Sequence, residues 1–218
     1  MVLTNPGLAG IVAGVKEGRI TFQRILTYAL NSVTKKIVQV LFLGVGLIMT
    51  GHAILTPMLM IIVMMAGDLL GMSLTTDHVR PSLLPNNWRI GTLTIAGIFM
   101  GVSELVFCVG VLAFGHFHLR LGIATLQTLA FFVLVCGNQA TMYAVRARGR
   151  IWSAPRPSRW LVLSSVADLM IALTMAGYGW LMRPLPWWVL VSVLVGAFAF
   201  AFALDLMKLP VFSRLKIA

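Results

Sequence analysis

The chain has 218 residues, of which 59% are hydrophobic and 11% charged, and its mean hydropathy is +0.95. A sequence this poor in polar residues cannot supply the surface of a soluble domain, which excludes a water-soluble globular protein. The net charge of +11 does not indicate nucleic-acid binding, because the basic residues lie between apolar runs and form no basic stripe. We therefore expect an all-α integral membrane protein whose first partner is the lipid bilayer.

Six apolar segments predict six membrane spans, each of which takes about 20 residues of helix. The segments are residues 36–49, 57–74, 90–114, 121–145, 160–182 and 187–207. The first is short, but residues 20–35 before it contain no Pro or Gly and carry apolar side chains at helical spacing. One helix over 20–49 would be roughly 45 Å long, so we expect its start to project from the membrane as a cytoplasmic stalk.

The distribution of lysine and arginine over the short loops predicts the orientation of the spans. One side collects the basic residues of the N-terminal segment, of the loops after the second and fourth spans, and of the C-terminus. The other side has only Arg120 and Arg183. We therefore expect both termini in the cytoplasm, which agrees with an even number of spans.

Acidic residues within apolar spans are candidate functional residues, because a charge in hydrocarbon is costly. Asp68 lies in the second span between Gly67 and Gly71, which permit close approach of helices. Its carboxyl group suits the loading and release of a proton or the coordination of a cation; a structural carboxyl bonded to a neighbouring helix is the alternative. Glu104, in the middle of the third span, is either a second proton carrier or a packing contact, and we favour packing.

Other polar residues of the spans have simpler interpretations. Gln39 and Asn138 either line a water-filled path or bond neighbouring helices. Asp205 is positioned to pair with Lys208 near the end of the last span. The sequence contains no phosphate-binding loop, nucleophile elbow or set of metal ligands. We therefore predict no catalytic residue, bound cofactor or metal for this chain, which cannot hydrolyse a nucleotide unaided.

Residues 76–89 form a proline-studded hinge between two apolar segments, with the sequence TDHVRPSLLPNNWR. This stretch closely resembles the short cytoplasmic loop after the sixth membrane helix of plasma-membrane-type proton-pumping P-type ATPases. The similarity extends along nearly the whole chain. Residues 2–8 (VLTNPGL) and 19–24 are similar to the exit from the phosphorylation domain into the fifth-helix stalk, whereas residues 146–153 (RARGRIWS) and 204–208 (LDLMK) resemble the loop into the ninth helix and the end of the tenth.

The resemblance implies that the six spans are the fifth to tenth helices of a pump that expels a proton, or another small cation, across the plasma (cell inner) membrane. Residues 1–19 would be the end of the phosphorylation domain or a linker, and residues 20–218 the C-terminal transmembrane domain. Asp68 matches the family's central proton carrier. Gln39 stands where the family has a stabilising arginine, so Lys35 or Lys36 could supply the counter-charge. The candidate ion-path residues are therefore Gln39, Lys36 and Glu104, beside Asp68 as carrier.

The same resemblance implies partners outside this chain. ATP and Mg²⁺ would be bound by upstream ATPase domains, in the same gene product or in a split subunit, where the aspartyl-phosphate forms. Two alternatives stay open at this point. One is a non-enzymatic scaffold or regulatory remnant that keeps the pump fold. The other is a secondary transporter that uses Asp68 and Glu104 as a proton relay, although the two related halves typical of such transporters are not visible.

Overall fold

A computed structural model describes residues 8–79, 81, 90–146 and 155–214. Throughout these residues the regular structure is helical, which confirms the predicted all-α class. There are six α-helices and one short 3₁₀ turn, η1, which continues the second helix. Their bounds are α1 (Leu8–Thr50), α2 (Pro57–Ser73), η1 (Leu74–Thr76), α3 (Ile90–Phe117), α4 (Ile123–Arg146), α5 (Arg159–Tyr178) and α6 (Trp187–Arg214).

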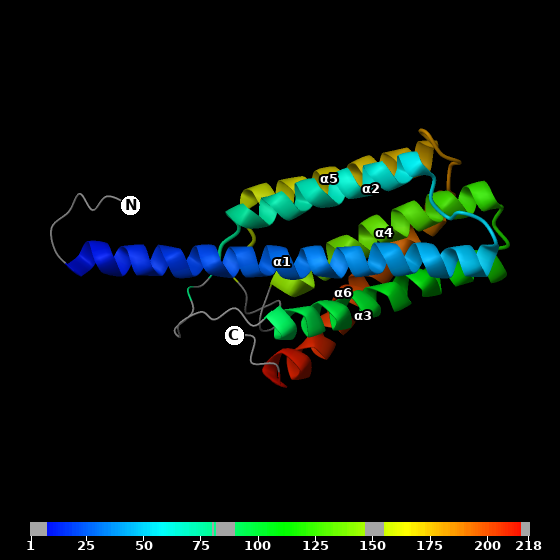
Figure 1. Cartoon of the computed structure of the whole chain (residues 1–218). Helices are drawn as coiled ribbons and strands as arrows, with labels where there is room; N and C mark the ends of the chain where they lie inside the picture. The colour runs from blue at the N-terminus through cyan, green and yellow to red at the C-terminus, as the bar shows by residue number, and fades with distance from the viewer. Residues whose placement is uncertain (1–7, 80, 82–89, 147–154, 215–218) are drawn as a thin grey trace.

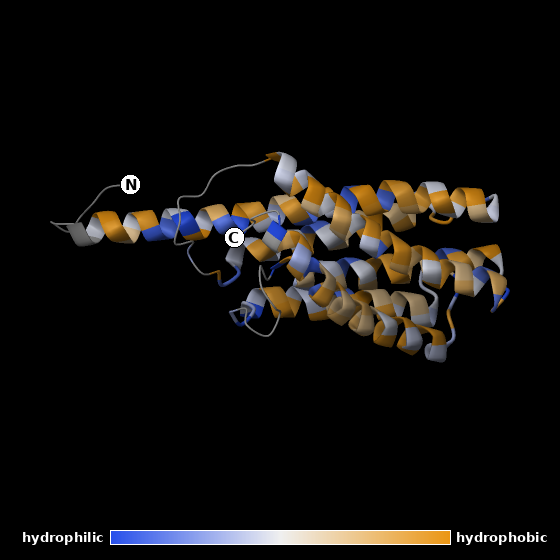
Figure 2. Cartoon of the chain, turned by 90° about the horizontal axis from the view of Figure 1, so that it is seen from below, coloured by the Kyte–Doolittle hydropathy of each residue, from blue (hydrophilic) through white to orange (hydrophobic). Residues whose placement is uncertain are grey.

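All six of these helices are long and apolar enough to cross a membrane. The chain is therefore a multi-pass membrane protein. Large apolar side chains lie on the outside of the bundle, with Ile48 of α1 as an extreme case at 87% exposed. Figure 2 shows hydrophobic residues along the bundle and hydrophilic ones gathered on the projecting part of α1 and at that end. Such an exterior suits contact with lipid, where each helix satisfies its own backbone hydrogen bonds.

Helix α4 is the centre of the bundle, because it packs against each of the other five helices. It is also the most buried of the six. In Figure 1, α2 and α5 run side by side, while α3 and α6 lie on the other side of α4. The main apolar core surrounds α4 and includes Phe131 and Phe132 of that helix together with Phe42 of α1. The central position of α4 means that any site in the bundle interior must include its side chains.

Helix α1 begins at Leu8, well before the predicted start at residue 20. Residues 8–19 contain three glycines, each of which costs about 1 kcal/mol relative to alanine in a helix. They contain no proline, however, and extending an existing helix adds one hydrogen bond for each residue that is fixed. The helix therefore continues through them, and its first part projects beyond the bundle in Figure 1, as expected for a stalk.

The other boundaries agree with prediction to within about a turn, except at the end of α6. Helix α5 ends at Tyr178 rather than near residue 182, because Gly179 adopts a left-handed conformation (φ 76°) and its N–H bonds the carbonyl of Met175. Helix α6 continues through Pro210 to Arg214 instead of ending at residue 207. Several stretches that carried the family resemblance lie outside the described residues: 1–7, 80, 82–89 and 147–154.

Candidate ion-binding site

A stripe of polar side chains runs along the buried face of α1. Its members recur at every fourth position, and none is more than 6% exposed: Gln23, Thr27, Asn31, Lys35 and Gln39. Residues four apart share one face of an α-helix, because the helix turns once every 3.6 residues. Polar groups buried in a membrane bundle are costly and mark interhelical bonding or the path of an ion. The stripe therefore locates the polar interior of this protein.

Lys35 is the charged member of this stripe, and it pairs with Asp68 of α2. Its Nζ lies 3.0 Å from Oδ1 of Asp68. The lysine side chain is 7% exposed, whereas that of the aspartate is 62% exposed. The lysine reaches across the bare surface of Gly67, where an added Cβ would lie 2.7 Å from Nζ. Glycine at position 67 therefore makes room for an ion pair between α1 and α2.

Glu104 of α3 is the second carboxyl of this region. It is 1% exposed, and it lies against Gly137 of α4, where an added Cβ would be 3.4 Å from its Oε1. Thr141, one turn further along α4, faces its carboxyl group, and the charge of Lys35 on α1 acts on it. Asn138, next to Gly137, also approaches Gly67, since its Nδ2 would lie 3.2 Å from a Cβ added there. The side chains of four helices thus meet around one lysine.

Several oxygen atoms of this cluster have no hydrogen-bond partner among the described residues. They are Oε2 of Glu104, Oδ1 of Asn138 and Oγ1 of Thr141, with Oδ1 of Asn31 further along the stripe on α1. Buried acceptors are normally satisfied, because a desolvated polar atom without a partner is costly. A proton on the carboxyl group, an ordered water or a bound cation would satisfy them. The cluster therefore has the chemistry of a proton or cation site.

The structure places the four candidate residues differently. Asp68 is paired with Lys35, and Glu104 belongs to the same cluster. Gln39 is buried one turn beyond Lys35 on the polar stripe. Lys36 is exposed on another face of α1, because one residue along a helix turns the side chain by about 100°. Of the two lysines considered as counter-charge, Lys35 is thus the one that reaches Asp68; the role of each residue stays a prediction.

A second polar cluster surrounds Asp77, which belongs to the hinge at residues 76–89 and directly follows η1; no contacts were predicted for this residue from the sequence. Its side chain is buried, and it accepts hydrogen bonds from Nε of Arg146 and from the backbone N–H of Ser158, the latter at 3.0 Å. Its backbone oxygen accepts from Nε of Arg24 at 2.9 Å. The cluster joins α1, η1, α4 and the start of α5. A lone carboxyl among basic residues was the signal that could have identified it.

Two further polar contacts stabilise the bundle outside the ion site. Lys208 is fully buried; its Nζ pairs with Oδ1 of Asp205 and donates to the carbonyl of Ala144, each at 2.6 Å. The pair between Asp205 and Lys208 was expected from their spacing. Nε2 of Gln139 donates to Oδ2 of Asp168 at 2.7 Å and so links α4 to α5. No group of three His, Cys, Asp or Glu side chains in the described part of the chain is placed to hold a metal.

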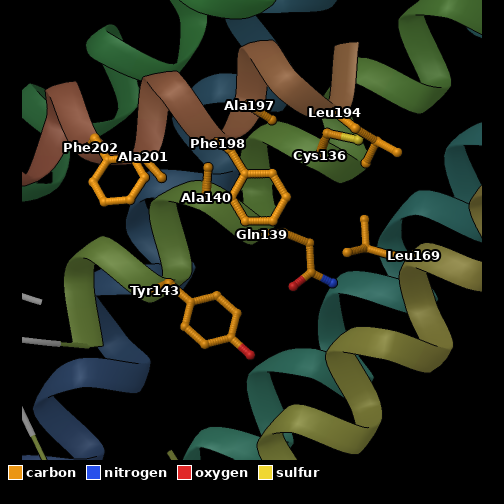
Figure 3. Close-up of a pocket in the computed structure, with 10 residues that line it drawn as sticks. All are labelled: Cys136, Gln139, Ala140, Tyr143, Leu169, Leu194, Ala197, Phe198, Ala201 and Phe202. Carbon is orange, nitrogen blue, oxygen red and sulfur yellow. The ribbon is translucent and has the colours of Figure 1, made fainter. Parts of the chain in front are cut away.

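A pocket of about 240 Å³ lies between α4, α5 and α6. Its lining is mostly apolar, with Phe198 and Phe202 of α6 on one side. Figure 3 shows the amide of Gln139 and the hydroxyl of Tyr143 as its polar edge. Neither Asp68 nor Glu104 lines this pocket.

The amino-acid sequence was compared with known proteins. No protein-family model matches the chain. Over 217 of its 218 residues, the chain is 26% identical to a protein of Methanocaldococcus jannaschii named "putative cation-transporting ATPase". The chain resembles part of an ion pump. It spans 27% of the length of that relative. This similarity and the six apolar helices support, at this coarser level, the resemblance to the membrane part of a P-type cation-transporting ATPase.

Proposed function

We propose that this chain is the ion-translocating membrane portion of a P-type cation-transporting ATPase and that the proton is the transported ion. Residues 20–218 form the membrane domain in this proposal, and residues 1–19 connect it to a phosphorylation domain. ATP and Mg²⁺ are bound by upstream domains, where an aspartyl-phosphate forms. Transport out of the cytoplasm is then driven by strain that α1 carries to the ion site.

The ion pair between Lys35 and Asp68 is the observation that carries this proposal. An ionised carboxyl within a membrane protein needs a counter-charge, and the lysine supplies one from the neighbouring helix at 3.0 Å. A fixed ammonium at this position also repels a metal cation that would bind the same carboxyl. The proton is not excluded in this way, because it binds the carboxyl covalently and leaves it neutral. The pair therefore favours proton transport over transport of a metal cation.

Two further features support the topology in this proposal. The start of α1 and the end of α6 lie at the same end of the bundle in Figure 1. In the described part of the chain, Arg146, Arg156, Arg159 and Arg214 lie at this end, and the positive-inside rule assigns such a side to the cytoplasm. We place both termini in the cytoplasm and the protein in the plasma (cell inner) membrane.

The test is ATP-driven proton uptake into inverted vesicles that contain this chain assembled with the upstream ATPase domains. We expect Asp68→Asn to abolish uptake and Lys35→Met to remove most of it. Lys36→Met is the matched comparison, because it removes the same charge one residue away from an exposed position. Uptake should be retained in that variant.

Equal uptake by native protein and Asp68→Asn would reject Asp68 as the carrier. Equal losses in the two lysine variants would reject the specific role of Lys35. ATP hydrolysis without proton uptake would identify a different transported cation. An assembled, folded complex with neither activity would favour the scaffold interpretation.

A further inference from the structure

We infer that Glu104 is a second proton-holding site, and that Lys35 is shared between Glu104 and Asp68 so that the proton on one carboxyl depends on the charge of the other. Its role in transport rests on the proposed function above. The protonation of Glu104 and its coupling to Asp68 do not rest on that function, because both are properties of this chain alone.

The geometry that points to this inference is the position of Glu104 without a dedicated cation. Its carboxyl is buried in the interior between α3 and α4, and its Oε2 has no hydrogen-bond partner in the part of the chain that the structure describes. On α4 the groups that face it are neutral, namely Thr141 and the backbone at Gly137. On α3 its titratable neighbour is Cys108, a thiol. An ionised carboxyl in such surroundings is very costly, so the group takes up a proton instead.

Lys35 is the cation whose charge acts on both carboxyls, as it also does on Asp168 of α5. Its Nζ is bonded to Oδ1 of Asp68, and the same ammonium acts electrostatically on Glu104. Its ammonium lies over Gly67, and the amide of Asn138 of α4 approaches the same glycine, so a polar side chain of α4 lies near the lysine. The lysine therefore has a polar neighbour when it changes partner.

The charges of the three groups balance in two arrangements. In the first, Asp68 is ionised, Lys35 is charged and Glu104 carries the proton, as the geometry of this structure indicates. In the second, Asp68 carries the proton, while Lys35 pairs with the ionised Glu104. One proton leaves Glu104 for each proton that Asp68 gains, and the net charge of the three groups is zero in both arrangements. The exchange thus avoids an uncompensated charge in the membrane interior.

The sequence makes a direct measurement possible, because the chain has only two glutamates, Glu17 and Glu104. Glu17 is exposed on the projecting part of α1 and serves as an internal reference. We suggest labelling glutamate at its carboxyl carbon in the full chain, reconstituted in lipid nanodiscs, and recording its nuclear magnetic resonance at neutral pH. The carboxyl resonance separates protonated from ionised groups. Glu17→Gln removes the reference signal and assigns the remaining one without disturbing the bundle interior.

We expect one ionised signal from Glu17 and one protonated signal from Glu104 in the native chain. In Asp68→Asn, the lysine is released from its partner, so the Glu104 signal should move to the ionised position. In Lys35→Met it should stay protonated. Two ionised signals in the native chain would overturn the proton-holding role of Glu104. A Glu104 signal unchanged in Asp68→Asn would overturn the sharing of Lys35.

The vesicle assay then separates this inference from the proposed function. If native protein shows no ATP-driven proton uptake while the resonances behave as expected, the proposed function fails and the coupled pair of carboxyls stands. If uptake depends on Asp68 but the Glu104 signal is ionised in every sample, the proposed function stands and the coupled pair of carboxyls fails. When both succeed, Glu104→Gln should lower the number of protons taken up for each ATP hydrolysed. An unchanged ratio would remove Glu104 from the transport path.

Discussion

Arg146, the last residue of α4, donates a hydrogen bond from its Nε to Oδ2 of Asp77, and both side chains are almost completely buried. This pair attaches the central helix to the end of α2 through η1. The backbone N–H of Ser158 and the guanidinium of Arg24 contact the same aspartate, so α1 and α5 are held at the same point. The end of α2, the end of α4 and the start of α5 therefore depend on one carboxyl, while Arg24 attaches α1 to the backbone oxygen of the same residue.

Replacement of Asp77 by alanine should destabilise the protein strongly. It leaves Arg146 as a buried charge without its partner, which typically costs about 3–5 kcal/mol. The measurement is thermal unfolding of the purified chain in lipid nanodiscs. The single variant Arg146→Gln and the double variant complete a cycle, in which the double loss should be smaller than the sum of the single losses. Additive losses would show that the pair is not coupled.

Gly67 should be essential for the position of Lys35. In Gly67→Ala the new methyl group would lie 2.7 Å from Nζ, so the lysine must move away from Asp68. We expect proton uptake by the assembled pump to fall as far as in Lys35→Met, while the chain remains folded. Gly71→Ala is the matched control on the same helix, since its nearest neighbour, Cε2 of Tyr28, would be at 3.4 Å. Similar uptake in the two alanine variants would contradict this prediction.

Gly115 provides a test of packing between α3 and α4 that is independent of ions. An alanine there would collide with the side chain of Leu129, which is 1% exposed, so we expect a loss of about 1–3 kcal/mol in unfolding free energy. At Gly110 of the same helix an added Cβ meets nothing within 4 Å. Gly110→Ala should therefore be neutral or stabilise the helix by up to about 1 kcal/mol. Thermal unfolding of both variants measures the two effects, and equal stability of Gly115→Ala and Gly110→Ala would contradict the predicted collision with Leu129.

The proposed orientation can be tested with single cysteines. After Cys108 and Cys136 are replaced by alanine, a cysteine is introduced at Lys16 on the projecting part of α1 or at His52 in the connection to α2; both positions are exposed. A membrane-impermeant thiol reagent should label position 16 in inverted vesicles and position 52 in right-side-out vesicles. The opposite pattern would place the termini outside the cytoplasm.

The fold was largely predictable from the sequence because its causes are local. Apolar runs of membrane-spanning length determine the helices, and their ends follow from single residues such as Gly179. The early start of α1 was missed because the glycines of residues 8–19 suggested a break, whereas continuation of an existing helix outweighs their cost.

The site was predictable only in part, because it depends on which faces of different helices meet. Asp68 and Glu104 were identifiable as acidic residues in apolar runs. The choice between Lys35 and Lys36 depends on the rotation of α1, and the four-residue spacing from Gln23 to Gln39 was the signal that could have decided it. Threonine is a common residue, and Thr141 has no distinctive spacing in the sequence. Only the packing of α4 against α3 shows that it faces Glu104.

The unbroken length of α1 has a mechanical consequence. No proline interrupts the 43 residues from its projecting start to its end beyond Lys35, so torsion applied at the start is transmitted along the whole helix. A side-chain atom stands roughly 6 Å from the helix axis, and a turn of roughly 30° moves it by about 3 Å. That displacement is comparable to the 3.0 Å that separates Lys35 from Asp68. A modest twist of α1 is therefore sufficient to break the ion pair without bending any helix.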